Sequence, residues 1–300
     1  MRKIVTYILI LLACISCGHT VDIDEKMTVD LCIASSELEL EDPQTRAQNP
    51  LDPGVENTIG NFWLLVYASD GRLAQAEYKT LGYNALSINY KVGFEKAGRY
   101  TLVVIANMGG VNTTDPDWPS SGDFKWGSHG GGSLYDLQHK IFGCSLDNPS
   151  IPHLFMSGIT EVEVGGADSQ KDINVMLSRL ASKFRVTIDS ASPGTYSNVR
   201  LQLLNCPARM GLFPEEIDLS AGGALTDTTP EVVISSGAYL NSKTSAFYYA
   251  NENLSPDPSK QTMIKVLAVR NGTEVSTVLP VSSHGITFRN TFYDIQITLK

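Results

Sequence analysis

The sequence of 300 residues lacks most signatures of a nucleic-acid-binding protein or a metalloprotein. Acidic residues outnumber basic ones, and the net charge of −9 argues against binding to nucleic acid or, through a basic patch, to anionic membranes. The five histidines are scattered, and no Cys-x-x-Cys pair occurs beyond residue 17. We therefore expect no metal, no cofactor and no nucleic-acid partner.

The signals for a catalytic serine are also incomplete. The stretch His129-Gly130-Gly131-Gly132 is similar to the oxyanion-hole motif of lipases. Those enzymes also need a serine on a Gly-x-Ser-x-Gly turn between a strand and a helix, and this motif does not occur in the sequence. The alternation of strands and helices that is typical of that fold is missing too. We expect a glycine-rich loop here and no enzyme.

Long apolar runs are missing except at the N-terminus, where Ile4–Ala13 follows two basic residues. This run is too short to span a bilayer and is typical of a secretory signal peptide. It ends in Cys14 and Cys17, a pattern that resembles bacterial lipoprotein signals, in which the new N-terminal cysteine is lipidated. Cys14 follows the better consensus, but Cys17 gives a leader of more usual length, residues 1–16, and is favoured. The alternative is a secreted protein without lipid.

Few cysteines remain after this leader. Export implies an oxidising compartment, but Cys32, Cys144 and Cys206 are odd in number, which argues against a scaffold built from disulfides. One bridge could form, most simply between Cys144 and Cys206, and the sequence leaves this open. No second apolar stretch could span a membrane, so any membrane attachment would be through lipid.

The rest of the chain is rich in strand patterns and poor in helix patterns. Residues 62–67 and 100–107 are apolar on both faces, as expected for central strands. Alternating apolar and polar residues predict further strands around residues 88–94, 162–164, 173–177, 184–188, 199–203, 264–269, 275–281 and 293–299. The sequence therefore predicts an all-β fold of tandem β-sandwiches, with domains over residues 47–178 and 179–300.

Three local signals complete this picture. Asn271-Gly272 favours a hairpin between two of the predicted strands. The glycine-rich stretch 108–132 predicts an exposed loop. Residues 133–141 offer one modest helix, which Ser133 can cap.

The segment 17–46 contains an amphipathic strand and an acidic tether. Val29, Leu31 and Ile33 face one way, and polar residues face the other. Exposed polar tethers are where proteases cut, and this tether ends at a single basic residue, Arg46. A cut between Arg46 and Ala47 would free the strand and leave a groove for a strand from another chain. The alternative is an ordinary first strand that is never cut.

Seven short phrases between residues 45 and 300 resemble the fimbrillin family, the FimA-like pilin lipoproteins of Bacteroides-type bacteria. They are Thr45-Arg46-Ala47, the stretch Glu56 to Tyr67 with the Asp70-Gly71 turn, Val104-Ile105-Ala106-Asn107, Phe155-Met156-Ser157-Gly158, Leu177-Ser178-Arg179-Leu180-Ala181, Tyr249-Ala250-Asn251-Glu252-Asn253, and Arg289-Asn290 with Tyr293. One departure is Ala250, where proline is expected.

This resemblance implies two tandem transthyretin-like β-sandwich domains with few short helices. It also implies export as a lipoprotein to the cell outer membrane, removal of the N-terminal strand by an Arg-specific protease, and assembly with other pilin subunits by strand exchange into a cell-surface fimbrium that supports adhesion. The role as shaft, tip or anchor stays open.

The resemblance also gives roles to individual residues. Arg46 and Ala47 flank the cleavage site, and Val29, Leu31 and Ile33 form the departing strand. The donor to a neighbouring subunit is the C-terminal strand, with Tyr293, Ile295, Ile297 and Leu299 on its apolar face. The alternative function is a surface lipoprotein that binds glycan or a host protein without polymerising.

Overall fold

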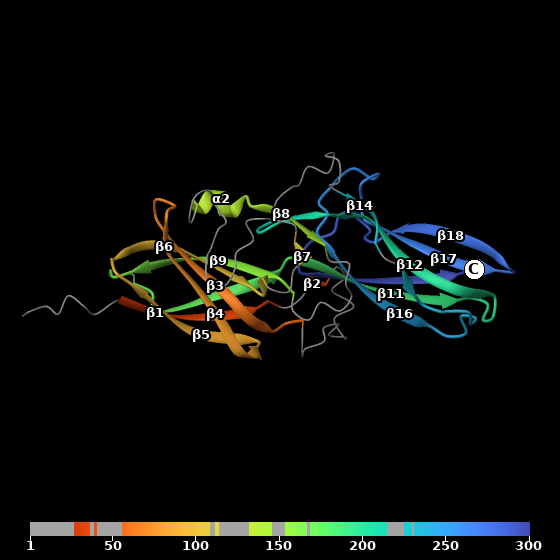
Figure 1. Cartoon of the computed structure of the whole chain (residues 1–300), viewed down its shortest axis with the longest axis horizontal. Coiled ribbons are helices and arrows are strands. Elements are labelled where there is room, and N and C mark those ends of the chain that lie inside the picture. The colour runs from red at the N-terminus through yellow and green to blue at the C-terminus, as the bar shows by residue number, and fades with distance from the viewer. Residues whose placement is uncertain are drawn as a thin grey trace, which may run out of the picture.

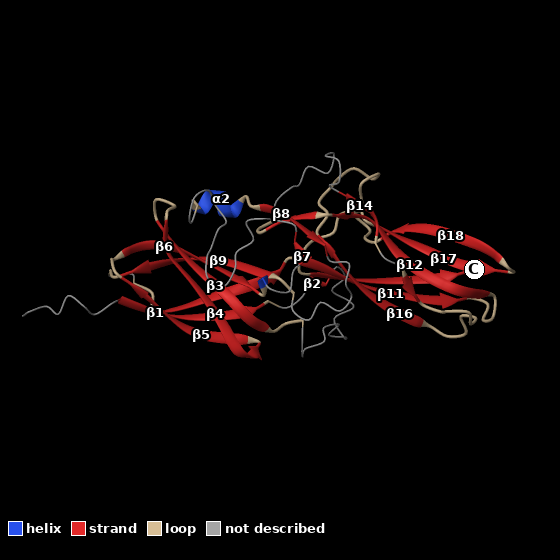
Figure 2. Cartoon of the chain, viewed as in Figure 1, coloured by secondary structure: helices blue, strands red, loops and turns tan. Residues whose placement is uncertain are grey.

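The chain folds into two lobes that lie end to end along its long axis (Figure 1). The computed structural model describes residues 27–36, 39–40, 56–108, 112–113, 132–145, 154–166, 169–214, 225–229 and 231–300. Regular structure is almost entirely strand (Figure 2), which confirms the prediction of an all-β fold with few helices. Within these ranges, no helix is long and apolar enough to cross a membrane.

The first lobe, called the N-lobe, contains seven strands around one apolar core. They are β1 (Met27–Ser35), β3 (Ile59–Ala68), β4 (Leu73–Ala85), β5 (Ser87–Phe94), β6 (Gly98–Ala106), β9 (Met156–Val164) and β10 (Asp172–Arg179). Their hydrogen-bonding order is β4-β3-β6-β9-β10-β1-β5. β10 pairs with β9 only at Ser178 and Arg179, so the chain of strands bends there into two layers that share the core.

The second lobe, called the C-lobe, has its own core between two further layers. One layer has the order β16-β11-β19-β2, and the other has the order β14-β12-β17-β18 with β15 beside β12. Their bounds are β2 (Glu39–Leu40), β11 (Ala181–Ser190), β12 (Tyr196–Pro207), β14 (Leu225–Thr228), β15 (Val232–Val233), β16 (Thr244–Asn251), β17 (Met263–Arg270), β18 (Thr273–Pro280) and β19 (Thr291–Leu299).

The two lobes repeat one strand arrangement. In the N-lobe the first strand, β1, lies between the parallel strand β10 and the antiparallel strand β5. In the C-lobe the first strand, β11, lies between the parallel strand β19 and the antiparallel strand β16. The opposite layers match as well, because β3-β6-β9 and β12-β17-β18 are both antiparallel series. β11 is therefore the C-lobe counterpart of β1.

The counterparts differ in how the chain continues from them. β11 reaches β12 through residues 191–195, whereas β1 reaches β3 through residues 36–58. The first strand of the N-lobe is therefore joined to its lobe by a connection several times longer. The transthyretin-like type and the boundary between residues 178 and 179 stay predictions.

A smaller sheet connects the lobes on one side. It contains β7 (Asn112–Thr113), β8 (Ile141–Ser145) and β13 (Arg209–Gly211). A third apolar cluster beneath it combines residues of both lobes, among them Trp63, Phe142 and Met210. The predicted loop 108–132 lies largely outside the described residues, but β7 forms a short strand within it.

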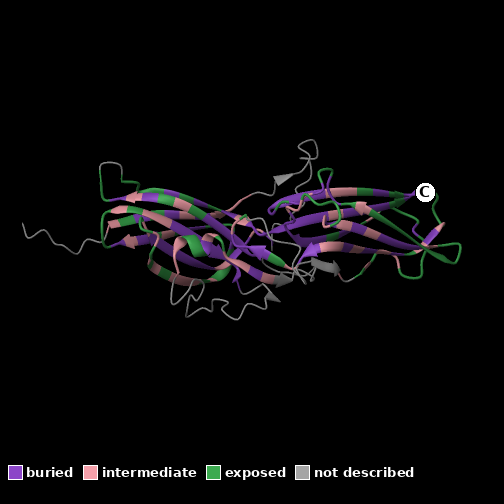
Figure 3. Ribbon diagram, turned by 90° about the horizontal axis from the view of Figure 1, so that it is seen from above, coloured by how far each residue is buried: buried purple, intermediate pink, exposed green. Residues whose placement is uncertain are grey.

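Two local predictions are confirmed in the structure. The helix α2 (Leu134–Gln138) begins at Ser133, whose hydroxyl accepts from the backbone of Asp136 while that carboxylate accepts in return, which is a capping box. Helix α2 is shorter than the predicted range 133–141. Between β17 and β18, Asn271 and Gly272 both have positive φ, as a two-residue hairpin turn requires. β18 is largely exposed, whereas β3 and β6 are largely buried. Figure 3 shows buried residues along the strands of both lobes.

The bend between the two N-lobe layers depends on a glycine. A Cβ atom at Gly158 of β9 would lie 2.5 Å from the carbonyl oxygen of Met176 and 2.9 Å from Cγ1 of Val175, both on β10. We expect Gly158→Ala to lower the free energy of unfolding by about 1–3 kcal/mol, because the backbone must shift. The measurement is unfolding in urea. Gly82→Ala on β4 is the control, because nothing lies within 4 Å of its Cβ position. Equal effects of the two substitutions would contradict this account.

Candidate functional site

β1 is hydrogen-bonded along both of its edges. Its residues Met27–Ala34 are in register with β5, and Asp30–Ser35 are in register with β10. A strand held in this way satisfies the main-chain groups of two neighbours as well as its own. Removing it would leave two unpaired edges facing each other across a gap.

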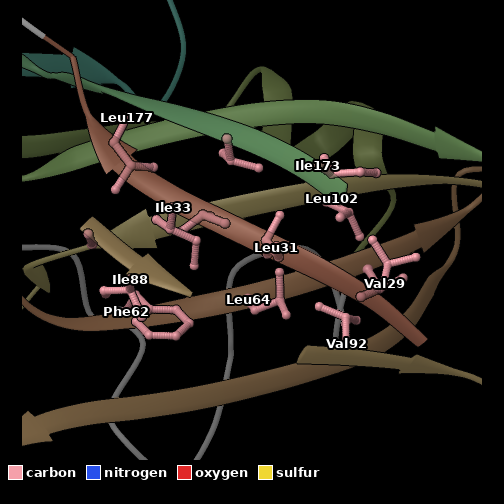
Figure 4. Close-up of a cluster of buried hydrophobic side chains, with 14 of the residues drawn as sticks. Val29, Leu31, Ile33, Phe62, Leu64, Ile88, Val92, Leu102, Ile173 and Leu177 are labelled. Atoms are coloured by element: carbon pink, nitrogen blue, oxygen red, sulfur yellow. The ribbon is translucent and has the colours of Figure 1, made fainter. Parts of the chain in front are cut away.

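The predicted apolar face of β1 is confirmed. Val29, Leu31 and Ile33 are each at most 1% exposed, and they point into the N-lobe core. Figure 4 shows them among side chains of both layers: Phe62, Leu64, Ile88, Val92, Leu102, Ile173 and Leu177. Burying three such side chains contributes roughly 5–9 kcal/mol, at 1.5–3 kcal/mol for each aliphatic side chain. An empty site would therefore be an apolar groove with two open edges.

The opposite face of β1 is polar and partly accessible. Asp30 forms an exposed ion pair with Lys91 of β5, with an N–O distance of 3.4 Å. Cys32 lies two residues further on and is partly buried. This face contributes little to the hold on the strand, because exposed ion pairs are worth about 0–1 kcal/mol.

A buried arginine connects the end of β1 to the start of β19. The guanidinium of Arg179 is fully buried and donates from Nη1 to the carbonyl oxygen of Ser36 at 2.8 Å and to Oδ1 of Asn290 at 2.7 Å. It also donates to the carbonyl oxygen of Glu56 at 3.4 Å and to Asn57. Desolvation lowers the pKa of Arg179 to about 10, against the opposing charges of Glu56 and Tyr249, so the group stays charged at neutral pH.

Two further ion pairs are buried at the junction between the lobes. Lys183 donates to both carboxylate oxygens of Glu56 at 2.7 Å, and the hydroxyl of Tyr249 donates to the same carboxylate. Arg289 pairs with Glu252, with 2.8 Å between Nε and Oε1. Arg289 also donates to the three carbonyl groups of residues 211–213. Buried charges of this kind must be paired and hydrogen-bonded. The Lys183–Glu56 pair therefore helps to fix how the lobes meet, whereas the partners of Arg289 all lie within residues 211–252.

Polar side chains without charge complete the junction. Asn107, at a φ of 63°, donates to the carbonyl oxygens of Thr58 at 2.8 Å and Leu154 at 3.0 Å. Ser157 in the N-lobe donates to the carbonyl oxygen of Leu212 at 2.7 Å. At least one residue of each fimbrillin-like phrase from Glu56 onward therefore lies in this region, although the phrases are spread over most of the sequence.

β19, the predicted donor strand, is fully integrated in the C-lobe. It pairs with β11 from Phe292 to Leu299, and its apolar face packs in the C-lobe core. Tyr293 is 1%, Ile297 6% and Leu299 9% exposed, and Ile295 is partly buried. On its other edge, the described partner is β2 alone, at Thr291 and Phe292. Beyond these two residues, β19 is an edge strand.

A cavity of about 360 Å³ lies beside the end of β19. β18 does not pair with β19 in the described structure, and the cavity lies between their edges. Its lining is mainly apolar, with Val266, Leu279, Ile297 and Leu299, and Arg270 and Lys300 add positive charge. The C-lobe is therefore more open along this seam than the N-lobe, where β9 and β10 pair directly.

The four strands β1, β10, β11 and β19 share one direction along the molecule. β10 runs toward the junction and ends there at Arg179, and β1 is parallel to it. β11 begins at the junction with Ala181, and β19 runs parallel to β11 and away from the junction. β19 therefore ends at the tip of the C-lobe, far from the start of β1 (Figure 1).

Several predicted residues lie outside the described part of the chain. These are Cys14, Cys17, Arg46 and Ala47, whose roles stay predictions. The bridge between Cys144 and Cys206 also stays a prediction; Cys206 is buried in the C-lobe core. Among the residues that the structure does describe, no group of three or more His, Cys, Asp or Glu could hold a metal ion.

Solved structures of bacterial surface proteins share this fold. A candidate cell adhesion protein of Parabacteroides distasonis aligns over 91% of this chain and 88% of its own, with a TM-score of 0.61 and 15% identity. The tip fimbrial protein Mfa3 of Porphyromonas gingivalis aligns over 91% and 95%, with a TM-score of 0.57 and 13% identity. Fimbrilin FimA of the same species aligns over 92% and 98%, with a TM-score of 0.55 and 13% identity.

The chain has a fimbrillin-like fold. The resemblance stated from its sequence is confirmed at this level, and the similar proteins are described as fimbrial or adhesive, not as enzymes. No protein-family model and no curated protein matches the sequence.

The contribution of the buried side chains of β1 to the stability of the fold can be measured by truncating one of them. Leu31→Ala should lower the free energy of unfolding of the uncleaved chain by about 2–5 kcal/mol, because it leaves a cavity among packed side chains. Asp30→Ala, on the exposed face of the same strand, should change it by less than about 1 kcal/mol. Urea unfolding compares the two. A loss of less than about 1 kcal/mol in both variants would mean that β1 is held mainly by its ladder.

The attachment of β19 to β11 should depend on pH. Arg185 donates from Nε to Oδ1 of Asp294 at 3.1 Å, and this hydrogen bond lowers the pKa of Asp294. Because the folded pKa is lowered, the stabilisation is present above the unfolded Asp pKa of about 3.9 and is lost as the pH falls through the folded value. Asp294→Asn should therefore flatten the loss of stability below about pH 4. Thermal unfolding at several pH values tests this, and an unchanged slope in the variant would contradict it.

Proposed function

We propose that this chain is a subunit of a cell-surface fimbrium and that it assembles by strand exchange after proteolysis. The observation that carries the proposal is the position of β1, which fills the centre of a sheet but is joined to its lobe by the long connection 36–58. The fimbrial and adhesive proteins that share the fold support the same role. The proposed partners are other copies or other pilin subunits.

The proposed cut lies between Arg46 and Ala47, within this connection. As long as the connection is intact, β1 is present at a high effective concentration beside its groove. After the cut, the contacts of β1 are unchanged, but the strand is lost once it dissociates and is diluted. A neighbouring subunit that presents a similar strand then competes for the groove.

β19 is the proposed donor because it has the right pattern and the right direction. Its apolar positions Tyr293, Ile295, Ile297 and Leu299 have the same spacing as Met27, Val29, Leu31 and Ile33 of β1. Because β19 points out of the C-lobe tip in the direction in which β1 runs, head-to-tail neighbours would place it parallel to β10, as β1 is.

Strand exchange must offset the cost of taking β19 out of its own lobe. Removing β19 would expose the edge of β11 and the apolar residues that β19 now covers. The gain in the neighbour is of similar kind, because the apolar face becomes buried again, and there the strand would pair along both of its edges. The net free energy of exchange is then small, and the irreversible loss of β1 gives it a direction.

Export as a lipoprotein completes the proposal. The leader 1–16 would be removed and Cys17, or alternatively Cys14, would carry lipid, so that the precursor reaches the outer membrane before an Arg-specific protease acts. The second candidate is a surface lipoprotein that binds glycan or host protein without polymerising. It is favoured by the deep packing of Tyr293 and Ile297 in the chain's own C-lobe.

A labelled peptide of residues 290–300 tests exchange without disturbing the C-lobe. It should bind the purified precursor only after an Arg-specific protease has cut it and the released segment has been separated, as measured by fluorescence anisotropy. Arg46→Ala should abolish binding, because β1 then stays in the groove.

Two altered peptides are the controls. Ile297→Asp, on the apolar face, should abolish binding, whereas Thr298→Asp, on the opposite face, should leave it nearly unchanged. If cut protein that has lost residues up to Arg46 binds none of the peptides, exchange through this groove is wrong. The non-polymerising adhesin then becomes the better account.

A further inference from the structure

The connection after β1 is more than a tether. The sequence predicts a polar, exposed tether after Ser36, but Glu39 and Leu40 form the strand β2, which is in parallel register with Thr291 and Phe292 of β19. This pairing covers the first part of the edge of β19 that faces away from β11. The segment that fills the N-lobe groove thus also touches the proposed donor strand.

A second contact joins the same two parts of the chain. Arg179 donates from one nitrogen, Nη1, to the carbonyl oxygen of Ser36 and to Oδ1 of Asn290. Asn290 immediately precedes β19 and has a φ of 54°, and its backbone N–H donates to the carbonyl oxygen of Ala181 at 2.9 Å. The end of β1 and the start of β19 are therefore bound to the same buried cation.

Ser36 is itself fixed to β10. Its backbone N–H donates to the carbonyl oxygen of Leu177 at 2.8 Å, and its hydroxyl donates to the same oxygen at 2.9 Å. Because three residue steps span about 10–11 Å at most, a β1 that is fixed in its groove keeps Glu39 and Leu40 close to the start of β19.

We infer that Ser36 and the strand β2 together form a latch on β19. Through the β2 ladder and the link from Ser36 to Asn290 by way of Arg179, they hold the start of the donor strand while β1 fills the groove. One cut at Arg46 would then release the groove and the donor together. This inference rests on the proposed departure of the segment, but the latch itself is a property of the uncleaved chain and can be tested there.

Hydrogen exchange of the uncleaved Arg46→Ala protein, followed by mass spectrometry, tests the ladder. The variant Glu39→Pro with Leu40→Pro removes both backbone N–H groups of β2, whichever of them donates to β19. Amides at the start of β19, residues 291–293, should exchange about tenfold faster, whereas those of β1 should keep their protection. The matched control, Glu39→Ala with Leu40→Ala, keeps both N–H groups and should exchange like the parent.

A second variant tests the link through Arg179. Asn290→Gly keeps the positive φ, which glycine adopts freely, and removes only the side chain that accepts from Arg179. It should also speed exchange at residues 291–293 by a few-fold to about tenfold. Asn271→Gly is the matched control: it too replaces an asparagine at positive φ, in the β17–β18 turn, and should leave β19 protected.

The outcomes separate the latch from the proposed function. Faster exchange in both test variants with protected controls supports the latch, even if the 290–300 peptide never binds the cut protein. Unchanged exchange at residues 291–293 in both test variants overturns the latch, even if strand exchange occurs. Equal acceleration in the alanine control also overturns it, because the main-chain ladder would then not be the contact that holds β19.

Discussion

When a central strand leaves a sheet, the main-chain N–H and C=O groups of both neighbouring strands lose their hydrogen-bond partners. This constraint governs β1, which pairs with β5 on one edge and β10 on the other while Val29, Leu31 and Ile33 fill the core. Such a site is stable when a strand fills it and unstable when it is empty. Under the proposed strand exchange, a strand of a neighbouring subunit would fill it in place of β1.

The comparison of the lobes explains why only one of them is built in this way. β11 occupies in the C-lobe the position that β1 occupies in the N-lobe, but it is followed within a few residues by β12. At the junction, Arg179 and Lys183 each have buried partners from the other part of the chain, so the lobes are joined by contacts that would be costly to break singly. Under the proposed strand exchange, the junction between the lobes would therefore stay fixed.

Local patterns were enough to predict much of this fold. The two faces of β1, the buried strands β3 and β6, the hairpin at Asn271-Gly272 and the capping box at Ser133 all depend on neighbours in sequence. β4 was missed because it is an edge strand with a largely polar, exposed pattern. The sequence predicts a tether at β2, because Glu39 and Leu40 lie among acidic residues and form a strand only by pairing with β19. The role of Arg179 was also beyond reach, since its partner Ser36 lies 143 residues away.

The shared direction of the parallel strands has a mechanical consequence. β1 with β10, and β19 with β11, lie as parallel pairs along the long axis of the molecule (Figure 1). Tension applied between the two tips of the molecule would pull the strands of each pair in opposite directions along their length. The hydrogen bonds between them would then carry the load together, in shear, and would not break one after another. A filament made by replacing β1 with a strand of the same direction would keep this loading geometry at every joint.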